Sequence, residues 1–139
     1  MRRLAVFLLA LLAPALALAE SPWPKDAEVY IISPADGATV SSPVRVVFGL
    51  SGMGVAPAGV ERKNTGHHHL FIDMPPPSGE DLVYNLPAED NLRHFGGGQT
   101  EALIELSPGT HTLQLVMGDA NHVPHDPPLV SKVITITVK

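Results

Sequence analysis

Alternation of apolar and polar side chains, interrupted repeatedly by proline, most constrains the fold of this chain. Residues 44–50 and 110–117 both alternate with a period of two, which is typical of a strand with one buried face. Beyond residue 19, no stretch longer than about ten residues follows a helical 3.6-residue period. Thirteen of the fourteen prolines also lie beyond residue 19, where they disfavour helices. The chain is therefore expected to be all-β.

The turn signals divide the chain into six expected strands. These strands span residues 29–32, 44–50, 68–73, 100–106, 110–117 and 131–138. Segments rich in Gly and Pro separate them, and residues 78–99 are expected to be irregular. Six or seven short strands within about a hundred residues are typical of an immunoglobulin-like sandwich. We therefore predict an immunoglobulin-like antiparallel β-sandwich of about seven strands over residues 29–139.

The first nineteen residues have the features of a secretory signal peptide. Arg2 and Arg3 form a basic start, residues 4–12 form an apolar stretch too short to span a bilayer, and Ala17-Leu18-Ala19 is a cleavage motif. We expect residues 1–19 to be removed and residues 20–28 to form an N-terminal leader segment. The protein would then be periplasmic or secreted, with no membrane insertion after cleavage. An uncleaved anchor is the alternative.

Charge and cysteine content exclude several classes of partner and site. Without residues 1–19 the chain has seven basic and fourteen acidic residues, a net charge of −7 with His neutral. This charge argues against binding to nucleic acid or to an anionic membrane. The chain contains no cysteine, so it has no disulfides and cannot supply a thiolate to a metal. His, Met, carboxylate and carbonyl groups remain as ligands.

Seven histidines are the candidate functional residues. Three are consecutive, from His67 to His69, and His122 and His125 lie in a loop with proline. Neutral imidazole is the commonest metal ligand in proteins. In the expected strand order the triplet, the segment with His94 and the loop after residue 117 meet at one end of the sandwich. His111 would lie at the other end, where we expect a structural role.

Strand periodicity separates the three consecutive histidines. Leu70 and Ile72 are expected to face the core, which points His68 inward and places His67 and His69 on the other face. The triplet then cannot act as one tridentate unit. We expect a Cu or Zn ion to be bound by His67 or His69 together with His122 and His125. The full set of candidate ligands and supporting residues is His67, His68, His69, His94, Asp119, His122 and His125.

The supporting residues also have structural interpretations. His68 could be a buried, hydrogen-bonded histidine, and His94 could be an ordinary loop residue. Asp119 could fix its loop through an Asx turn instead of supporting a ligand. Met53 and Met117 lie near the same rim and would favour Cu(I), but a methionine in the position of Met117 is more often a core residue.

Long stretches of the chain resemble a known family. They are Ser33–Val40, Phe48–Gly59, His67–Asp73, Gly109–Val116 and Gly118–Pro128. On these residues the chain resembles the exported bacterial domain-of-unknown-function family numbered 4399, a resemblance that implies no activity. The segment Ser33–Ala38 and the following strand are also similar to periplasmic copper-resistance sandwiches. Those proteins bind copper partly through an N-terminal His, whereas the expected N-terminus here is Glu20. That part of the copper site does not transfer, and the same difference argues against a histidine-brace copper monooxygenase.

Two functions from different classes are consistent with the sequence. The first is a periplasmic or secreted His-rich metal-binding protein, acting as a copper or zinc chaperone, buffer or resistance factor. The second is a non-enzymatic interaction module that binds another envelope protein and whose histidines are structural. The chain has no nucleophile elbow, phosphate loop or Rossmann fingerprint. Among Glu61, Asp73 and Asp119, none is singled out as the base of a metal hydrolase. We therefore do not expect an enzyme.

Overall fold

The computed structural model of the chain describes residues 21–139 and contains nine β-strands in that range. The predicted signal peptide lies outside the described residues. The strands are β1 (Glu28–Ser33), β2 (Thr39–Val40), β3 (Val44–Ser51), β4 (Gly54–Val55), β5 (Thr65–Ile72), β6 (Leu92–His94), β7 (Glu101–Ile104), β8 (Gly109–Gly118) and β9 (Ile134–Val138).

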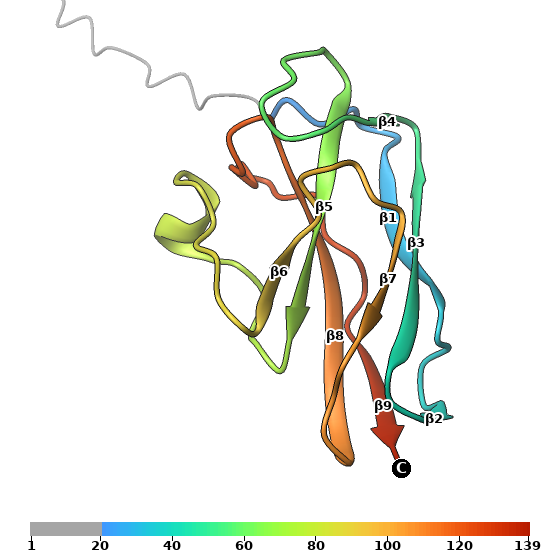
Figure 1. Cartoon of the computed structure of the whole chain (residues 1–139). Helices are drawn as coiled ribbons and strands as arrows, with labels where there is room; N and C mark the ends of the chain where they lie inside the picture. Colours follow the sequence, from blue (N-terminus) through green and yellow to red (C-terminus); the bar gives the residue numbers. More distant parts are fainter. Residues whose placement is uncertain (1–20) are drawn as a thin grey trace, which may run out of the picture.

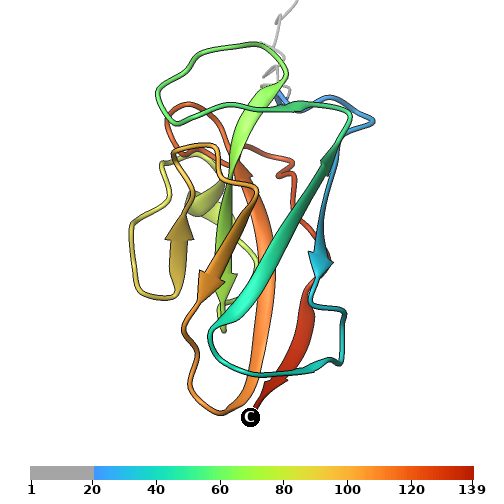
Figure 2. The same ribbon diagram turned by 45° about the vertical axis from the view of Figure 1, so that its right-hand side comes forward.

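The strands form two sheets that face each other (Figure 1, Figure 2). One sheet has the order β1-β3-β7, and the other has the order β2-β9-β8-β5-β4, with β6 paired to β5. This arrangement confirms the predicted immunoglobulin-like β-sandwich. The pairing is antiparallel except at two short edge strands, because β2 runs parallel to β9 and β4 runs parallel to β5.

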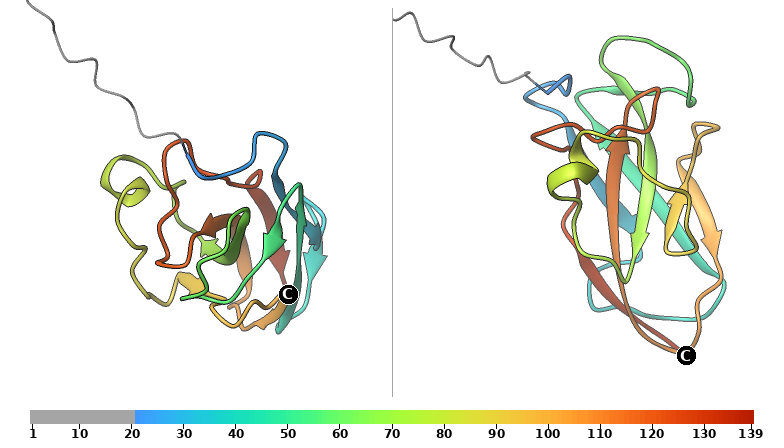
Figure 3. Two further views of the ribbon diagram at one scale, coloured as in Figure 1. Left: turned by 90° about the horizontal axis from the view of Figure 1, so that it is seen from above. Right: turned by 90° about the vertical axis from the view of Figure 1, so that its left-hand side faces the viewer.

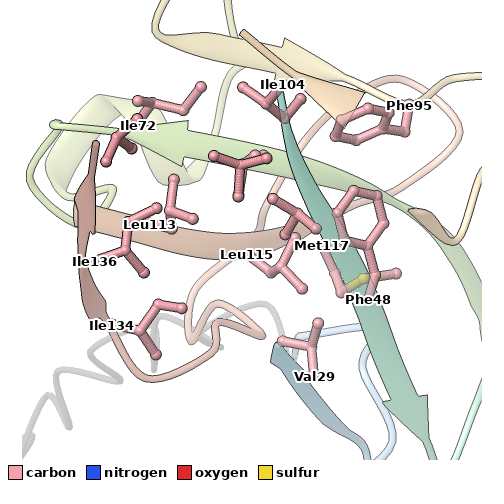
Figure 4. Close-up of a cluster of buried hydrophobic side chains, with 14 residues drawn as sticks. Val29, Phe48, Ile72, Phe95, Ile104, Leu113, Leu115, Met117, Ile134 and Ile136 are labelled. Atoms are coloured by element: carbon pink, nitrogen blue, oxygen red, sulfur yellow. The ribbon is translucent and has the colours of Figure 1, made fainter. Parts of the chain in front are cut away.

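The main core lies between the sheets and follows from the alternation in β3 and β8. Phe48 of β3 faces Leu113, Leu115 and Met117 of β8 (Figure 4). Val46 of β3 belongs to the same buried cluster. All five side chains are buried, and burying an aliphatic or aromatic side chain of this size contributes about 1.5–3 kcal/mol. No disulfide is needed because this cluster extends through most strands of both sheets.

A second, smaller core covers the outer face of the six-stranded sheet. It consists of Phe71, Leu86, Leu92 and Val116, with Met74 and Val130 packed against them. The segment between β5 and β6, which includes one turn of 3-10 helix (Gly79–Leu82), folds over this face (Figure 1, Figure 3). In residues 21–139, no helix is long and apolar enough to cross a membrane.

The expectation that residues 78–99 are irregular is wrong at β6. This strand is only three residues long, and it forms because Leu92 pairs with Phe71 and joins the second core. So short an element has no readable period, and its stability comes from β5, which is distant in the sequence.

Two strands also start three residues away from their predicted positions. Strand β5 begins at Thr65 because that residue and Gly66 pair with β4. Strand β9 begins at Ile134, three residues after the predicted start. Ser131 instead uses its hydroxyl to accept the Leu115 N–H at 2.9 Å and its own N–H to donate to the Leu115 carbonyl at 2.9 Å.

His111 lies near the start of β8 and links three segments. Its Nδ1 is 2.7 Å from Oδ2 of Asp73, and its Nε2 is 2.8 Å from the carbonyl oxygen of Ser107. Both partners are acceptors, so the ring can donate to both only when it is protonated. These hydrogen bonds raise the pKa of His111. Asp73 also accepts the Thr112 N–H at 2.8 Å, so the pair ties the end of β5 to β8.

We predict that His111→Ala lowers the free energy of unfolding by about 1 kcal/mol near pH 6, because it removes hydrogen bonds to a charged ring. A raised pKa in the folded state means that this stabilisation is complete below the unfolded pKa of 6.5 and declines as the pH rises through the folded value. Urea unfolding of both proteins from pH 6 to pH 9 measures the difference. Thr110→Ala, on the same strand, serves as the control and should show no such trend. A His111→Ala effect that does not vary with pH would contradict the assignment.

Candidate metal centre

The three consecutive histidines lie within β5, and their side chains alternate between the two faces of the sheet. All three are fully buried. His68 points into the main core, where its ring centroid lies 5.1 Å from that of Phe48. The rings of His67 and His69 lie 4.6 Å apart on the outer face, beside the second core. The predicted separation of His68 from its neighbours is therefore confirmed.

His122, from the loop between β8 and β9, completes a group of three. Its Nδ1 lies 3.0 Å from Nε2 of His67 and 3.2 Å from Nε2 of His69. One ring nitrogen from each histidine lies within 4.8 Å of the other two, and these three residues could hold a metal ion. The expectation that the loop after β8 lies beside the histidine triplet is confirmed by these distances.

The turn that carries His122 is fixed by Asp119. Oδ1 of Asp119 accepts the N–H groups of Asn121 at 2.8 Å and of Val123 at 3.0 Å, while its carbonyl accepts the His122 N–H at 3.0 Å. Asp119 therefore forms the Asx turn that the sequence analysis gave as the alternative to a role in supporting a ligand. His122 itself has a φ of 65°, in the left-handed region that few non-glycine residues adopt. Its carbonyl accepts the Leu86 N–H at 3.0 Å, which helps to hold this conformation.

His94 forms one wall of the histidine group. It lies directly across from His69 in the β5–β6 pairing, with ring centroids 4.5 Å apart, and its ring centroid lies 4.9 Å from that of His122. Its Nε2 donates to the carbonyl oxygen of Pro87 at 2.8 Å. A neutral ring has one N–H, so this bond leaves Nδ1 of His94 unprotonated.

His125, which was expected to bind the ion together with His122, does not join the group of His67, His69 and His122. Its Nε2 donates to Oδ2 of Asp119 at 2.8 Å, and its ring meets the edge of Trp23 at a centroid distance of 5.7 Å. Burial opposes ionisation of Asp119, but hydrogen bonds from Val123, His125 and Asn121 outweigh it and lower the pKa of this carboxyl. Among residues 21–139, the group of three thus contains both His67 and His69 with His122, and His125 supports the loop.

Burial keeps these imidazoles neutral. Loss of hydration, together with the nearby His122 and His94, lowers the pKa of His67 to about 4. Burial and the neighbouring histidines lower the pKa of His69 to about 2, and burial also lowers that of His122. Metal ligation requires the neutral form of imidazole. The three rings are therefore in the ligating form at neutral pH without losing a proton.

Hydrogen bonds alone cannot satisfy the three converging nitrogens. Nδ1 of His122 can carry one proton or one lone pair, yet it faces Nε2 of both His67 and His69. If both Nε2 atoms are protonated, two N–H groups compete for the one lone pair of His122, and the Nδ1 atoms of His67 and His69 are buried acceptors. Within residues 21–139 neither Nδ1 makes a hydrogen bond of normal geometry, although the backbone of Val116 lies close enough to His69 to oppose part of the fall in its pKa. If both Nε2 atoms are unprotonated, a single His122 N–H is shared between two lone pairs, and the two Nδ1 atoms become buried donors. A cation would accept a lone pair from each ring and remove the conflict.

The group is reached from one side of the molecule. His67 and His69 are fully buried, whereas His122 is partly exposed. His122 also lines an open, shallow depression together with Ala58, Gly59, Val83, Tyr84, Asn85, Ala120, Asn121 and Val123. Of the three residues in the group, His122 is therefore the one that an approaching ion could contact from solvent.

Sequence reasoning missed Gly118. A Cβ atom on this residue would overlap Cε1 of His69 and lie 3.0 Å from its Nδ1, so the ring occupies space that any side chain would fill. The signal was present, because glycine within an alternating strand often marks a close approach of another group. Leu86 and Pro87 were also missed, since they contribute only backbone atoms to His122 and His94.

A family model described as Domain of unknown function (DUF4399) matches residues 46–139. The chain belongs to this family. The matched range contains all seven histidines, so the candidate site lies entirely within the DUF4399 domain. No curated protein and no solved structure matches the chain. The similarity to copper-resistance sandwiches remains a prediction.

We predict that this DUF4399 protein loses stability in acid. Burial lowers the pKa of both His67 and His68 to about 4, below the unfolded value of 6.5. As the pH falls below 6.5, the unfolded chain takes up protons that the folded chain does not, so the free energy of unfolding decreases. Urea unfolding at pH 7 and pH 5 should show this loss.

His68→Leu tests the contribution of the core histidine. Within residues 21–139 neither ring nitrogen of His68 makes a hydrogen bond of normal geometry, although the backbone of Gln99 lies close enough to oppose part of the fall in its pKa. Leucine removes both nitrogens and retains contact with Phe48. Replacing an unsatisfied polar group by an apolar one is close to neutral or stabilising. We expect the variant to match or exceed the parent at pH 7 and to lose less stability at pH 5. A variant less stable than the parent at both pH values would show that His68 has a polar role.

Proposed function

We propose that this DUF4399 protein is an exported carrier or buffer for Cu(II) or Zn(II), which His67, His69 and His122 would bind. The observation that carries the proposal is the convergence of three neutral ring nitrogens whose hydrogen bonding cannot be satisfied. A buried unsatisfied polar group costs about 1–3 kcal/mol, so such a group in a folded domain calls for a ligand. The predicted signal peptide supports an extracytoplasmic location.

The ligand chemistry supports copper or zinc over other metals. Three imidazole nitrogens suit Zn(II) and Cu(II), whereas Mg(II) and Ca(II) prefer oxygen. For a given nitrogen site, Cu(II) binds more tightly than Zn(II). Three protein ligands would leave one position for water or for a ligand from another molecule. That open position, on the side of the partly exposed His122, supports a role in transferring the ion to another envelope protein.

The other candidate residues would support the site without binding the ion. His94 is held by Pro87 beside the ring of His69, where it restricts the movement of that ring. Asp119 and His125 fix the turn on which His122 sits. His68 belongs to the main core, on the opposite face of β5.

We predict that the parent protein binds one Cu(II) or Zn(II) ion per chain in isothermal titration calorimetry at pH 7. Loss of a supporting residue around a metal typically weakens binding by about 10–100-fold. Loss of a ligand should therefore cost more, and we expect His122→Ala to weaken binding by more than about 100-fold. His125→Ala should weaken it less, because its ring contacts Asp119 rather than the converging nitrogens.

His111→Ala is the matched control, since it removes an imidazole from the other end of the domain. It should retain parental stoichiometry and affinity. If the parent binds neither ion specifically, or if His122→Ala binds as tightly as the parent, the metal proposal is wrong. The histidines would then be structural, and the envelope interaction module would be the better interpretation.

Gly118→Ala provides a test that removes no nitrogen atom. The new methyl group would overlap the ring of His69 and displace it from His67 and His122. We expect weaker metal binding by calorimetry, while circular dichroism still shows a folded β-protein. Gly54→Ala is the control for the loss of a glycine, because Gly54 has no positive φ and the nearest atom to a Cβ there is Cγ2 of Thr65 at 3.4 Å, an ordinary van der Waals contact. Parental affinity in Gly118→Ala would show that the position of the His69 ring does not matter.

A further inference from the structure

The single tryptophan of the chain lies in the segment before β1, outside the range matched by the family. Trp23 is partly buried and packs against the main core. Its Nε1–H donates to the carbonyl oxygen of Pro124 at 2.6 Å, and the edge of its ring meets His125 at an interplanar angle of 81°. The N-terminal segment is thus bonded to the loop between β8 and β9, about a hundred residues further along the chain.

The other side of the indole lies over the backbone of β5. A Cβ atom on Gly66 would lie 3.1 Å from Cζ3 and 3.2 Å from Cη2 of Trp23. Gly66 directly precedes His67, and the same Cβ would lie 2.7 Å from the carbonyl oxygen of Gly118. The indole therefore contacts both the strand that carries His67 and His69 and the loop that carries His122.

A continuous set of contacts leads from Trp23 to the turn of His122. The indole holds Pro124 and His125, His125 donates to Oδ2 of Asp119, and Oδ1 of Asp119 accepts two N–H groups on either side of His122. We infer that Trp23 is a positioning residue, which clamps the His122 loop against β5 so that the three ring nitrogens stay together. The relevance of this clamp to metal binding rests on the function proposed above.

Trp23→Phe tests the clamp with the smallest change. It removes the Nε1–H donor to Pro124 and retains an aromatic ring over Gly66. Two properties are measured: hydrogen exchange of the Asn121, His122 and Val123 amides in the metal-free protein, and affinity for Cu(II) and Zn(II) by calorimetry. These amides all donate to Asp119, so their exchange reports directly on the turn.

The control is Val44→Ala, which removes volume from the main core. Val44 is the first residue of β3, where it is buried and pairs with Ile104. Neither residue takes part in the contacts between Trp23 and the His122 turn described above. This variant should lose overall stability while its turn amides keep parental exchange and its metal affinity is unchanged. It separates a general loss of stability from a specific loss of positioning.

In Trp23→Phe we expect the three amides to exchange about threefold to tenfold faster, the effect of losing one hydrogen bond, and metal affinity to fall by a similar factor. Parental amide exchange would overturn the clamp, whatever the affinity. Faster exchange with parental affinity would overturn a positioning role in metal binding. If the parent binds neither ion, the proposed function fails, and amide exchange in the metal-free protein still decides whether Trp23 holds the turn.

Discussion

The antiparallel pairing of β5 with β8 determines the rest of this structure. It sets His67 opposite Gly118 and His69 opposite Val116, and it delivers the β8–β9 loop to the level of the outer-face histidines. Because side chains alternate along a strand, this register sends His68 into the core and leaves its two neighbours on the outer face. A shift by one residue would reverse every assignment, placing two imidazoles between the sheets and one outside.

The all-β sandwich and the split of the histidine triplet were predictable because both depend on a period of two, which Leu70, Ile72 and the residues of β8 display clearly. Strand β6, which carries His94, was not predictable, because three residues cannot show a period and the strand forms only by pairing with β5. The choice between His122 and His125 was equally hidden. Both residues have a left-handed backbone, and they differ in their distant contacts: His122 is held by Leu86, whereas His125 lies against Trp23. No local pattern encodes these contacts.

Placing three imidazoles wholly inside a domain of this size costs stability. Within residues 21–139 the ring nitrogens of His68 and the Nδ1 atoms of His67 and His69 make no hydrogen bond of normal geometry, and each such atom is unfavourable relative to its hydrated state. For His67 and His69 the other ring nitrogens converge on His122. His68 has no such role, and its ring lies between Phe48 and the backbone of Gln99. The two cores provide the apolar burial that offsets this cost.

The histidine group adjoins the second core, on the opposite face of the six-stranded sheet from the main core. The residues that determine how firmly the domain folds are therefore largely separate from those that would determine what it binds. Changes in side-chain volume between the sheets act on the face of β5 that points away from His67 and His69. An engineer could therefore strengthen the interior of the sandwich first and then redesign the ligands on the outer face of the six-stranded sheet, using the added stability to tolerate the changes.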